Sequence, residues 1–195
     1  LRRLEPGDVL FDAKAGRDGE RAEIVANARI LRCDEIGQAV IRLAGRPLID
    51  HVLDRLAGAG VETAVVNVHY LPDLLEESLA RRDGTKPAIL VSDERGVLLD
   101  TGGGAKRALP MLGAGPFFIH NADTVWSEGP SPALVRMLKL WTPELMDCLL
   151  LLAPLNSSIG YAGKGDFSMA PDGRLKRRGE RQIVPFAFAG VSLCD

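Results

Sequence analysis

The chain has 195 residues, enough for one domain with a substantial core, and its 46% hydrophobic and 26% charged residues are usual for a soluble globular protein. Its formal net charge of -2 argues against nonspecific binding to nucleic acid or to an anionic membrane, and its longest apolar run, at positions 149–155, is too short to span a bilayer. Its three cysteines lie far apart and are odd in number, so they indicate neither a disulfide framework nor a metal knuckle, and we expect a cytoplasmic protein.

The spacing of apolar residues, Gly and Pro predicts the elements from residue 46 onward. Residues 1–45 have no clear pattern, apart from an apolar patch at 22–31 that fits a strand or a short helix. The predicted elements are, in chain order, a helix from Pro47 to Gly58, a strand at 63–68, a helix from Pro72 with Leu74, Leu75 and Leu79 inward, a strand at 88–92, a helix at 104–112, a strand at 116–121, a helix capped by Ser131-Pro132, a strand at 147–152, a hairpin turn at Asp172-Gly173 and a strand at 184–191.

Strand and helix alternate throughout positions 46–153. This alternation is typical of parallel βαβ units joined by right-handed crossovers. We therefore predict an α/β fold, a three-layer Rossmann-like domain with a mostly parallel central sheet. Residues 1–195 are expected to form a single domain, with 1–35 as an atypical N-terminal segment. The sequence indicates no oligomeric state.

A glycine triplet, Gly102-Gly103-Gly104, follows Asp100-Thr101 and opens an expected helix. Glycines let a backbone approach a ligand closely, and the N–H groups at a helix start favour anions. The triplet could instead mark a strand-to-helix turn that needs positive φ. It matches neither the dinucleotide fingerprint nor the P-loop, so by itself it leaves both interpretations open.

Asp123 comes directly after the predicted strand at 116–121. A carboxylate just past a strand end lies where open α/β sheets bind ligands and metal, although Asp at this position can also cap the turn through its own side chain. Together with the glycine triplet, Asp123 predicts a nucleotide site with a divalent cation beside it. The neighbouring His120 is expected in the core or at the surface, because no histidine has the spacing of a zinc ligand.

A basic run at 174–178 (Arg-Leu-Lys-Arg-Arg) follows the predicted hairpin turn. It either meets substrate phosphates or forms the solvated face of a hairpin, and the second interpretation is the more common one for charge runs. No nucleophile elbow and no Cys–His couple is evident, so a covalent nucleophile is not expected.

Four segments occur in an order that resembles a known enzyme family. They are 45–49 (Gly-Arg-Pro-Leu-Ile), 65–71 (Val-Val-Asn-Val-His-Tyr-Leu), 98–104 (Leu-Leu-Asp-Thr-Gly-Gly-Gly) and 118–123 (Phe-Ile-His-Asn-Ala-Asp). Over about residues 36–193 they resemble the sugar-1-phosphate nucleotidyltransferases, and within that family the bacterial branch that uridylylates an N-acetylmuramate 1-phosphate in cell-wall sugar recycling.

The resemblance implies that a nucleoside triphosphate, expected to be UTP, and a sugar 1-phosphate bind on a Rossmann-like sheet. An oxygen of the sugar phosphate attacks the α-phosphorus and pyrophosphate leaves, while Mg²⁺ and basic groups neutralise charge. Asp123 matches the first magnesium-binding Asp and is the expected catalytic and metal-binding residue. The other implied roles are nucleotide binding by Thr101, Gly102, Gly103, Gly104 and Asn121, and sugar binding by Gly165, Asp166, Glu180 and Gly190.

Two departures from the family pattern concern the ends of the match. The family opens with a glycine-rich triphosphate loop and a Pro-Lys pair, whereas this chain has no glycine at 24–35 and carries Gly37-Gln38 at the pair. Arg29 or Arg32 could supply the missing cation. A second metal-binding Asp that the family places beyond the last strand is absent from these residues, as if the C-terminal part were truncated. The alternative hypothesis is therefore a catalytically impaired or non-catalytic protein that binds nucleotide or sugar on the same fold.

Overall fold

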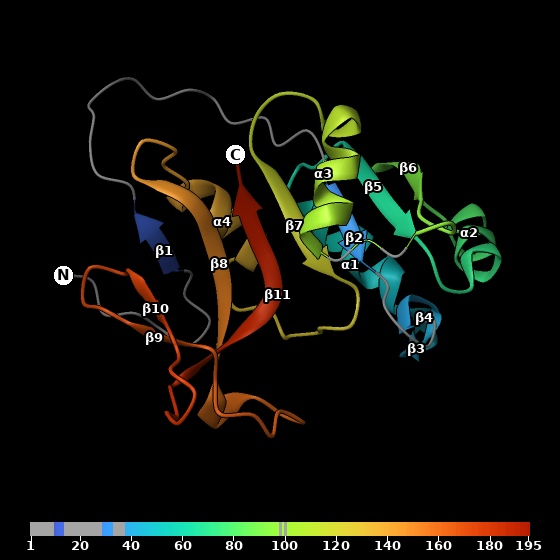
Figure 1. Cartoon of the computed structure of the whole chain (residues 1–195). Helices are drawn as coiled ribbons and strands as arrows, with labels where there is room; N and C mark the ends of the chain where they lie inside the picture. Colours follow the sequence, from blue (N-terminus) through green and yellow to red (C-terminus); the bar gives the residue numbers. More distant parts are fainter. Residues whose placement is uncertain (1–9, 14–28, 33–37, 98, 100) are drawn as a thin grey trace. The chain divides into compact units, whose positions relative to one another are not determined.

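A computed structural model describes residues 10–13, 29–32, 38–97, 99 and 101–195 (Figure 1). The chain divides into two compact units. Residues Glu23–Val125 form the first, here called the parallel unit, and Leu1–Ala22 with Trp126–Asp195 form the second, here called the antiparallel unit. The single domain expected from the sequence stays a prediction, and each unit is described by itself.

The parallel unit is built on four strands in the order β7-β2-β5-β6. All three neighbouring pairs run parallel. The strands are β2 (Arg29–Arg32), β5 (Thr63–Val68), β6 (Ala88–Asp93) and β7 (Phe117–Asn121). Sequence order reverses beside β2, because β5 and β6 extend the sheet in one direction and β7 adds on the other side. This is the doubly wound arrangement of Rossmann-like sheets.

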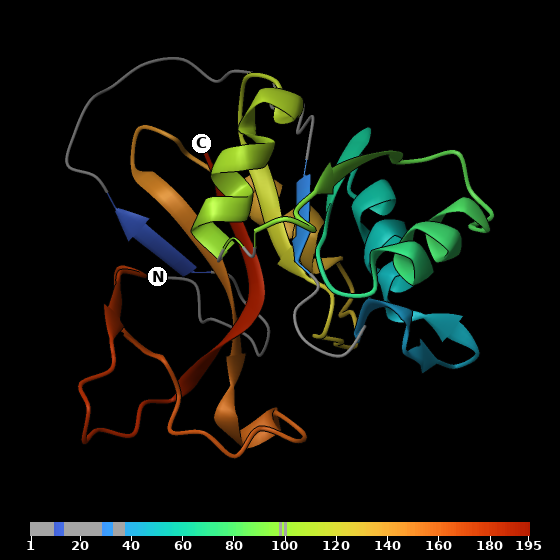
Figure 2. The same ribbon diagram turned by 45° about the vertical axis from the view of Figure 1, so that its right-hand side comes forward.

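Three helices connect these strands: α1 (Leu48–Gly58), α2 (Pro72–Ala80) and α3 (Thr101–Leu112). Right-handed crossovers place the helices on opposite faces wherever the direction of winding reverses. Figure 2 accordingly shows α3 on one side of the sheet and α1 with α2 on the other. Before α1, a 3-10 turn, η1 (Gln38–Val40), leads into a short hairpin of β3 (Arg42–Leu43) and β4 (Arg46–Pro47).

The core of the parallel unit follows the apolar patterns in the sequence. Four side chains of α1 are buried at helical spacing, and they are Ile49, Val52, Leu53 and Leu56. In β5 every residue from Ala64 to Val68 is buried, as expected of a strand covered on both faces. The predictions of α1 and β5 are therefore confirmed.

Two predictions in this unit are wrong in detail. Leu75 and Leu79 of α2 are buried, but Leu74 is 49% exposed, because residues four apart share the inward stripe and Leu74 lies outside it. The third helix begins at Thr101 rather than at residue 104. None of Gly102, Gly103 and Gly104 has a positive φ, so the proposed positive-φ turn is also wrong.

The antiparallel unit is built on β8 (Met146–Pro154), which pairs antiparallel with β1 (Leu10–Ala13) and with β11 (Phe186–Cys194). A hairpin of β9 (Phe167–Met169) and β10 (Leu175–Arg177) turns at Asp172-Gly173, as predicted, and β9 pairs with β11. Helix α4 (Ala133–Leu140) contacts β8, and η2 (Leu155–Ser157) follows that strand. None of the described helices is long and apolar enough to cross a membrane.

The predicted mostly parallel sheet needs correction. The strands are parallel in one unit and antiparallel in the other, so the sheet is parallel only in part. An apolar run such as 147–152 shows that a strand is buried, but not which way its neighbours run. The predicted cap of α4 is also wrong, since Ser131 makes no cap bond and Glu128 Oε2 instead accepts the Ala133 N–H at 2.8 Å.

Candidate functional site

The carboxyl ends of the parallel strands meet at one edge of their sheet. Asn121 of β7 lies opposite Arg32 of β2, and Asn67 of β5 lies opposite Ser92 of β6. This edge therefore carries a polar residue near the end of each strand. In open α/β sheets ligands bind outside the carboxyl ends, where the strand order reverses. Here that position lies between β2 and β7.

Asp123 stands two residues beyond β7 at this edge, and its side chain is exposed. Its Oδ1 accepts a hydrogen bond from the Thr124 hydroxyl at 3.3 Å. The strand behind it is anchored, because Phe118 and His120 are fully buried and His120 Nδ1 lies 2.6 Å from the Asn121 carbonyl oxygen. A rigid strand thus presents an accessible carboxylate at its end.

The three glycines of the triplet occupy the first turn of α3, where helical N–H groups lack partners within the helix. They differ in their surroundings. A Cβ added at Gly102 would meet no atom within 4 Å, so this position is open. A Cβ at Gly103 would lie 3.1 Å from Leu99 Cβ, and one at Gly104 would lie 3.1 Å from both Asn67 Nδ2 and Glu94 Oε1. Gly104 therefore packs on the protein, and Gly102 faces outward.

A buried polar cluster, formed by Asn67 and Glu94, packs against the first turn of α3. Asn67 is 6% exposed and Glu94 is 3% exposed. Asn67 Nδ2 donates to Glu94 Oε1 and, at 3.4 Å, to the Gly104 carbonyl oxygen. The His69 Nδ1 atom lies 2.7 Å from the Glu94 carbonyl oxygen. These bonds join the ends of β5 and β6 to the start of α3.

Asn67 and Glu94 are not among the site residues predicted from the sequence. The available signal was Asn67 itself, a polar side chain inside an otherwise apolar buried strand. Two atoms of the edge, Asn67 Oδ1 and Ser92 Oγ, are buried without a hydrogen-bond partner among the described residues. Buried polar atoms are costly when unpaired. A hydrogen-bond donor from a ligand or water would therefore be favourable at Asn67 Oδ1, and a donor or an acceptor would be favourable at Ser92 Oγ.

The Asp123 carboxylate suits a magnesium ion in one respect. Mg²⁺ is usually held by one or two carboxylates while substrate phosphates and water fill its other positions, and Asp123 offers one exposed carboxylate of this kind. In the part of the chain that the structure describes, no group of three or more His, Cys, Asp or Glu side chains could hold a metal ion. Among the described residues a cation at Asp123 would therefore have one carboxylate, and substrate phosphates and water would fill its other positions.

The predicted sugar-binding residues lie in the antiparallel unit, and three of them surround Arg178. The Arg178 Nε donates to the Gly165 carbonyl oxygen at 2.8 Å, and its Nη1 donates to the Glu180 carbonyl oxygen at 3.1 Å. Its backbone N–H donates to the Asp166 carbonyl oxygen at 2.8 Å. Arg178 of the basic run is thus engaged with the backbone, while Arg174, Lys176 and Arg177 are exposed, as in the solvated interpretation.

Gly165 and Asp166 are part of the framework of this unit. Gly165 has φ +77°, and a Cβ there would clash with the Val184 carbonyl oxygen. Asp166 Oδ2 accepts the Phe188 N–H at 2.9 Å, and the Asp166 N–H donates to the Phe186 carbonyl oxygen at 2.7 Å. Their role in sugar binding stays a prediction.

The other two predicted sugar residues differ in exposure. The Glu180 side chain is exposed in the loop after β10. Gly190 is buried in β11 with φ +74°, between Phe188 and Ser192, where the pairing with β8 shifts register. A glycine with positive φ is typical of such a bulge.

The N-terminal departures from the family pattern lie largely outside the described residues. This holds for 24–28 and 33–37 and for the side chains of Arg29, Arg32 and Gln38. Asp100, which precedes the glycine triplet, also lies outside the described residues. Whether an arginine replaces the missing cation stays a prediction.

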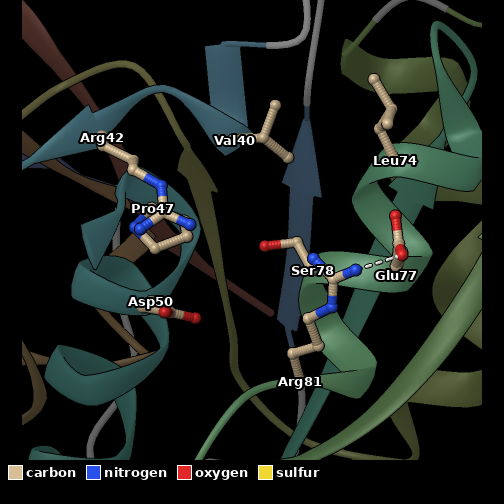
Figure 3. Close-up of a pocket in the computed structure, with 8 residues that line it drawn as sticks. All are labelled: Val40, Arg42, Pro47, Asp50, Leu74, Glu77, Ser78 and Arg81. Atoms are coloured by element: carbon tan, nitrogen blue, oxygen red, sulfur yellow. Dashed lines mark hydrogen bonds and ion pairs between the residues drawn. The ribbon is translucent and has the colours of Figure 1, made fainter. Parts of the chain in front are cut away.

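A pocket of about 290 Å³ lies elsewhere in the parallel unit, between the β3–β4 hairpin with the start of α1 and the α2 helix (Figure 3). An ion pair between Glu77 and Arg81 forms one wall, and Asp50 and Arg42 lie across from it. None of the predicted site residues lines this pocket.

Comparisons with known proteins identify the class of enzyme to which this chain is related. No family model matches the chain. The solved structure of a UDP-glucose pyrophosphorylase complexed with UDP-glucose superposes with a TM-score of 0.68 at 12% identity, covering 88% of this chain and 76% of that one, which shows the fold alone. By fold and by sequence, the chain is a relative of the sugar-1-phosphate nucleotidyltransferases, and the predicted resemblance is confirmed.

The sequence similarity is more specific. The chain is 45% identical over 159 residues to the N-acetylmuramate alpha-1-phosphate uridylyltransferase of Caulobacter vibrioides, covering 80% of this chain and 66% of that protein. It is 31% identical over 143 residues to the protein of the same name from Neisseria meningitidis, covering 73% of this chain and 60% of that protein. The match thus spans less than two thirds of each of these two relatives.

Proposed function

We propose that this protein transfers a uridylyl group from UTP to a sugar 1-phosphate, giving a nucleotide sugar and pyrophosphate. The observation that carries the proposal is the 45% identity to the Caulobacter uridylyltransferase over 159 residues. The aligned residues make up 80% of the chain. We place the reaction in the cytoplasm and in cell-wall sugar recycling, as the resemblance implies.

The geometry of the parallel unit supports nucleotide binding at its carboxyl edge. The first turn of α3 offers backbone N–H groups beside the open Gly102 position, which favours an anion or a closely approaching base and ribose. The buried Asn67–Glu94 pair holds Gly104, so this turn is fixed before a ligand arrives. Preorganisation of this kind reduces the entropy lost on binding.

The proposed chemistry depends on positioning and on charge neutralisation. An oxygen of the sugar 1-phosphate forms a bond to the α-phosphorus of UTP while the bond from that phosphorus to the pyrophosphate oxygen breaks. Bound Mg²⁺ would supply positive charge to the phosphate oxygens. Asp123 would hold the ion from the end of β7, and Asn121 would contact the nucleotide beside it. Gly165, Asp166, Glu180 and Gly190 would hold the sugar.

Pyrophosphate release from UTP tests this proposal, with N-acetylmuramate 1-phosphate as acceptor and Mg²⁺ present. The Asp123→Asn variant should lose at least a hundredfold in turnover, since the uncharged amide is a poor magnesium ligand. Asp83→Asn is the matched control, because Asp83 is exposed outside the predicted site, and it should behave like the unchanged protein. Equal turnover in both variants would reject the role of Asp123.

The same assay separates the alternative hypothesis of a non-catalytic binding protein. The absence of glycine at 24–35 and the Gly37-Gln38 pair favour that alternative. It predicts a rise in melting temperature with UTP and Mg²⁺ but no pyrophosphate with any sugar 1-phosphate, whereas the proposed activity predicts both. Ligand that binds only the native state raises its stability by about 2.7 kcal/mol at a hundredfold excess over Kd.

A further inference from the structure

Two cysteines that lie 46 positions apart in the sequence face each other in the antiparallel unit. Cys148 of β8 lies directly opposite Cys194 of β11 in the strand register. Their sulfur atoms are 3.1 Å apart, and both residues are thiols with intermediate exposure. The two cysteines are therefore close in space although they lie far apart in the sequence.

The backbone geometry at this pair suits a disulfide. Directly opposite residues of antiparallel strands have Cα atoms about 4.5–5.5 Å apart, which lies within the range of about 4.4–6.8 Å that disulfides adopt. A bond between the two sulfurs requires only that they move closer by side-chain rotation. Neither strand has to shift.

The surroundings of Cys194 favour its reactive form. The hydrogen bond with Cys148 lowers the pKa of Cys194, burial raises it and the hydrogen bond with Ser192 lowers it further, and together they bring the pKa to about 7. The thiolate is the form of cysteine that attacks a disulfide. Partial exposure gives a small reagent access to it.

We propose that Cys148 and Cys194 form a reversible dithiol–disulfide site that reacts with small disulfides of the glutathione class. The Cys194 thiolate attacks one sulfur of the small disulfide, forms a mixed disulfide and releases the other half as a thiolate. Cys148 then loses its proton and attacks Cys194 Sγ, which forms the intrachain bond and releases the second thiolate. The protein loses two electrons and two protons, and the small disulfide is reduced to two thiols.

The bond would connect the two long strands of the antiparallel unit. It would lie beside Ser192 and a few residues beyond Gly190, where the β8–β11 pairing shifts register. Because it closes a chain segment of 46 positions, it should stabilise the oxidised form by limiting the freedom of the unfolded chain. This inference does not depend on the proposed function.

The test is equilibration of the full chain in buffers of reduced and oxidised glutathione, followed by acid quenching, alkylation, intact mass and peptide mapping. The Cys33→Ser variant removes the third cysteine, which lies outside the described residues, and keeps the pair. It should lose two hydrogen atoms in mass and yield one linked peptide that joins Cys148 to Cys194. Its melting temperature should rise by roughly 5 °C or more on oxidation.

The Cys148→Ser and Cys194→Ser variants are the matched controls. Each should stop at a mixed disulfide with glutathione and show no such rise in melting temperature. The proposal is overturned if the folded Cys33→Ser variant remains a dithiol in excess oxidised glutathione. It is equally overturned if the bond in the unchanged chain joins Cys33 or a second molecule.

Discussion

The two units place the predicted site residues in different physical situations. In the parallel unit, Gly102 faces open space and the Asp123 side chain is exposed beyond its strand. In the antiparallel unit, Gly165 packs against the Val184 carbonyl and Asp166 bonds to Phe188. The comparison suggests that changes at Gly102 and Asp123 alter binding and leave the fold intact, whereas changes at Gly165 and Asp166 weaken the fold itself.

The strongest test of this difference is Gly165→Ala. An alanine would have to adopt φ near +77° and would place its Cβ against the Val184 carbonyl oxygen, so we expect a loss of about 3 kcal/mol or more in the free energy of unfolding. Urea denaturation measures it. Gly129→Ala in the same unit is the control, since no atom lies within 4 Å of its added Cβ. Equal stability of the two variants would contradict the framework role of Gly165.

A second test addresses the buried cluster that holds the start of α3. Glu94→Ala removes the acceptor of the Asn67 amide in a buried site, so we expect a loss of about 2 kcal/mol in unfolding free energy. The exposed Glu62→Ala change should alter stability by less than about 0.5 kcal/mol. An unchanged urea midpoint for Glu94→Ala would mean that the cluster contributes nothing to the fold.

The smallest expected effects come from the first and the last glycine of the triplet. Gly104→Ala must displace Asn67 or Glu94 by a few tenths of an ångström, and we expect a loss of about 1 kcal/mol. The methyl group of Gly102→Ala would meet open space, and alanine has the higher helix propensity. The free energy of unfolding of this variant should therefore rise by up to about 0.5 kcal/mol.

The Gly102→Ala variant also distinguishes the two interpretations of the triplet. If the backbone at Gly102 approaches the nucleotide, the added methyl group should raise the KM for UTP although the protein is more stable. A stable variant with an unchanged KM would leave only a structural role for the triplet.

The sequence predicted the parallel unit better than the antiparallel one, for physical reasons. Helical and strand periodicities identified α1 and β5 because each buries a local pattern. The start of α3 at Thr101 was not predicted, because glycine has a low helix propensity and often marks the end of a helix. Here Gly104 lets α3 come into close contact with Asn67 and Glu94. That contact joins residues far apart in the chain.

The antiparallel unit shows the same limit more strongly. The run at 147–152 fits a parallel strand as well as an antiparallel one, and only the partners β1 and β11 decide between them. The roles of Arg178 and the Cys148–Cys194 pair likewise arise from contacts across the fold. Motif order, in contrast, indicated the family, because it needs no knowledge of contacts.

Hydrogen exchange with and without UTP, in the presence of Mg²⁺, tests the central claim most directly. The account predicts that UTP slows exchange in peptides covering the start of α3 (Thr101–Leu112) and the residues after β7 (Phe117–Asn121), with little change in β8 (Met146–Pro154). Protection confined to the antiparallel unit, or no protection at UTP concentrations that support turnover, would contradict the assignment of the nucleotide to the parallel edge.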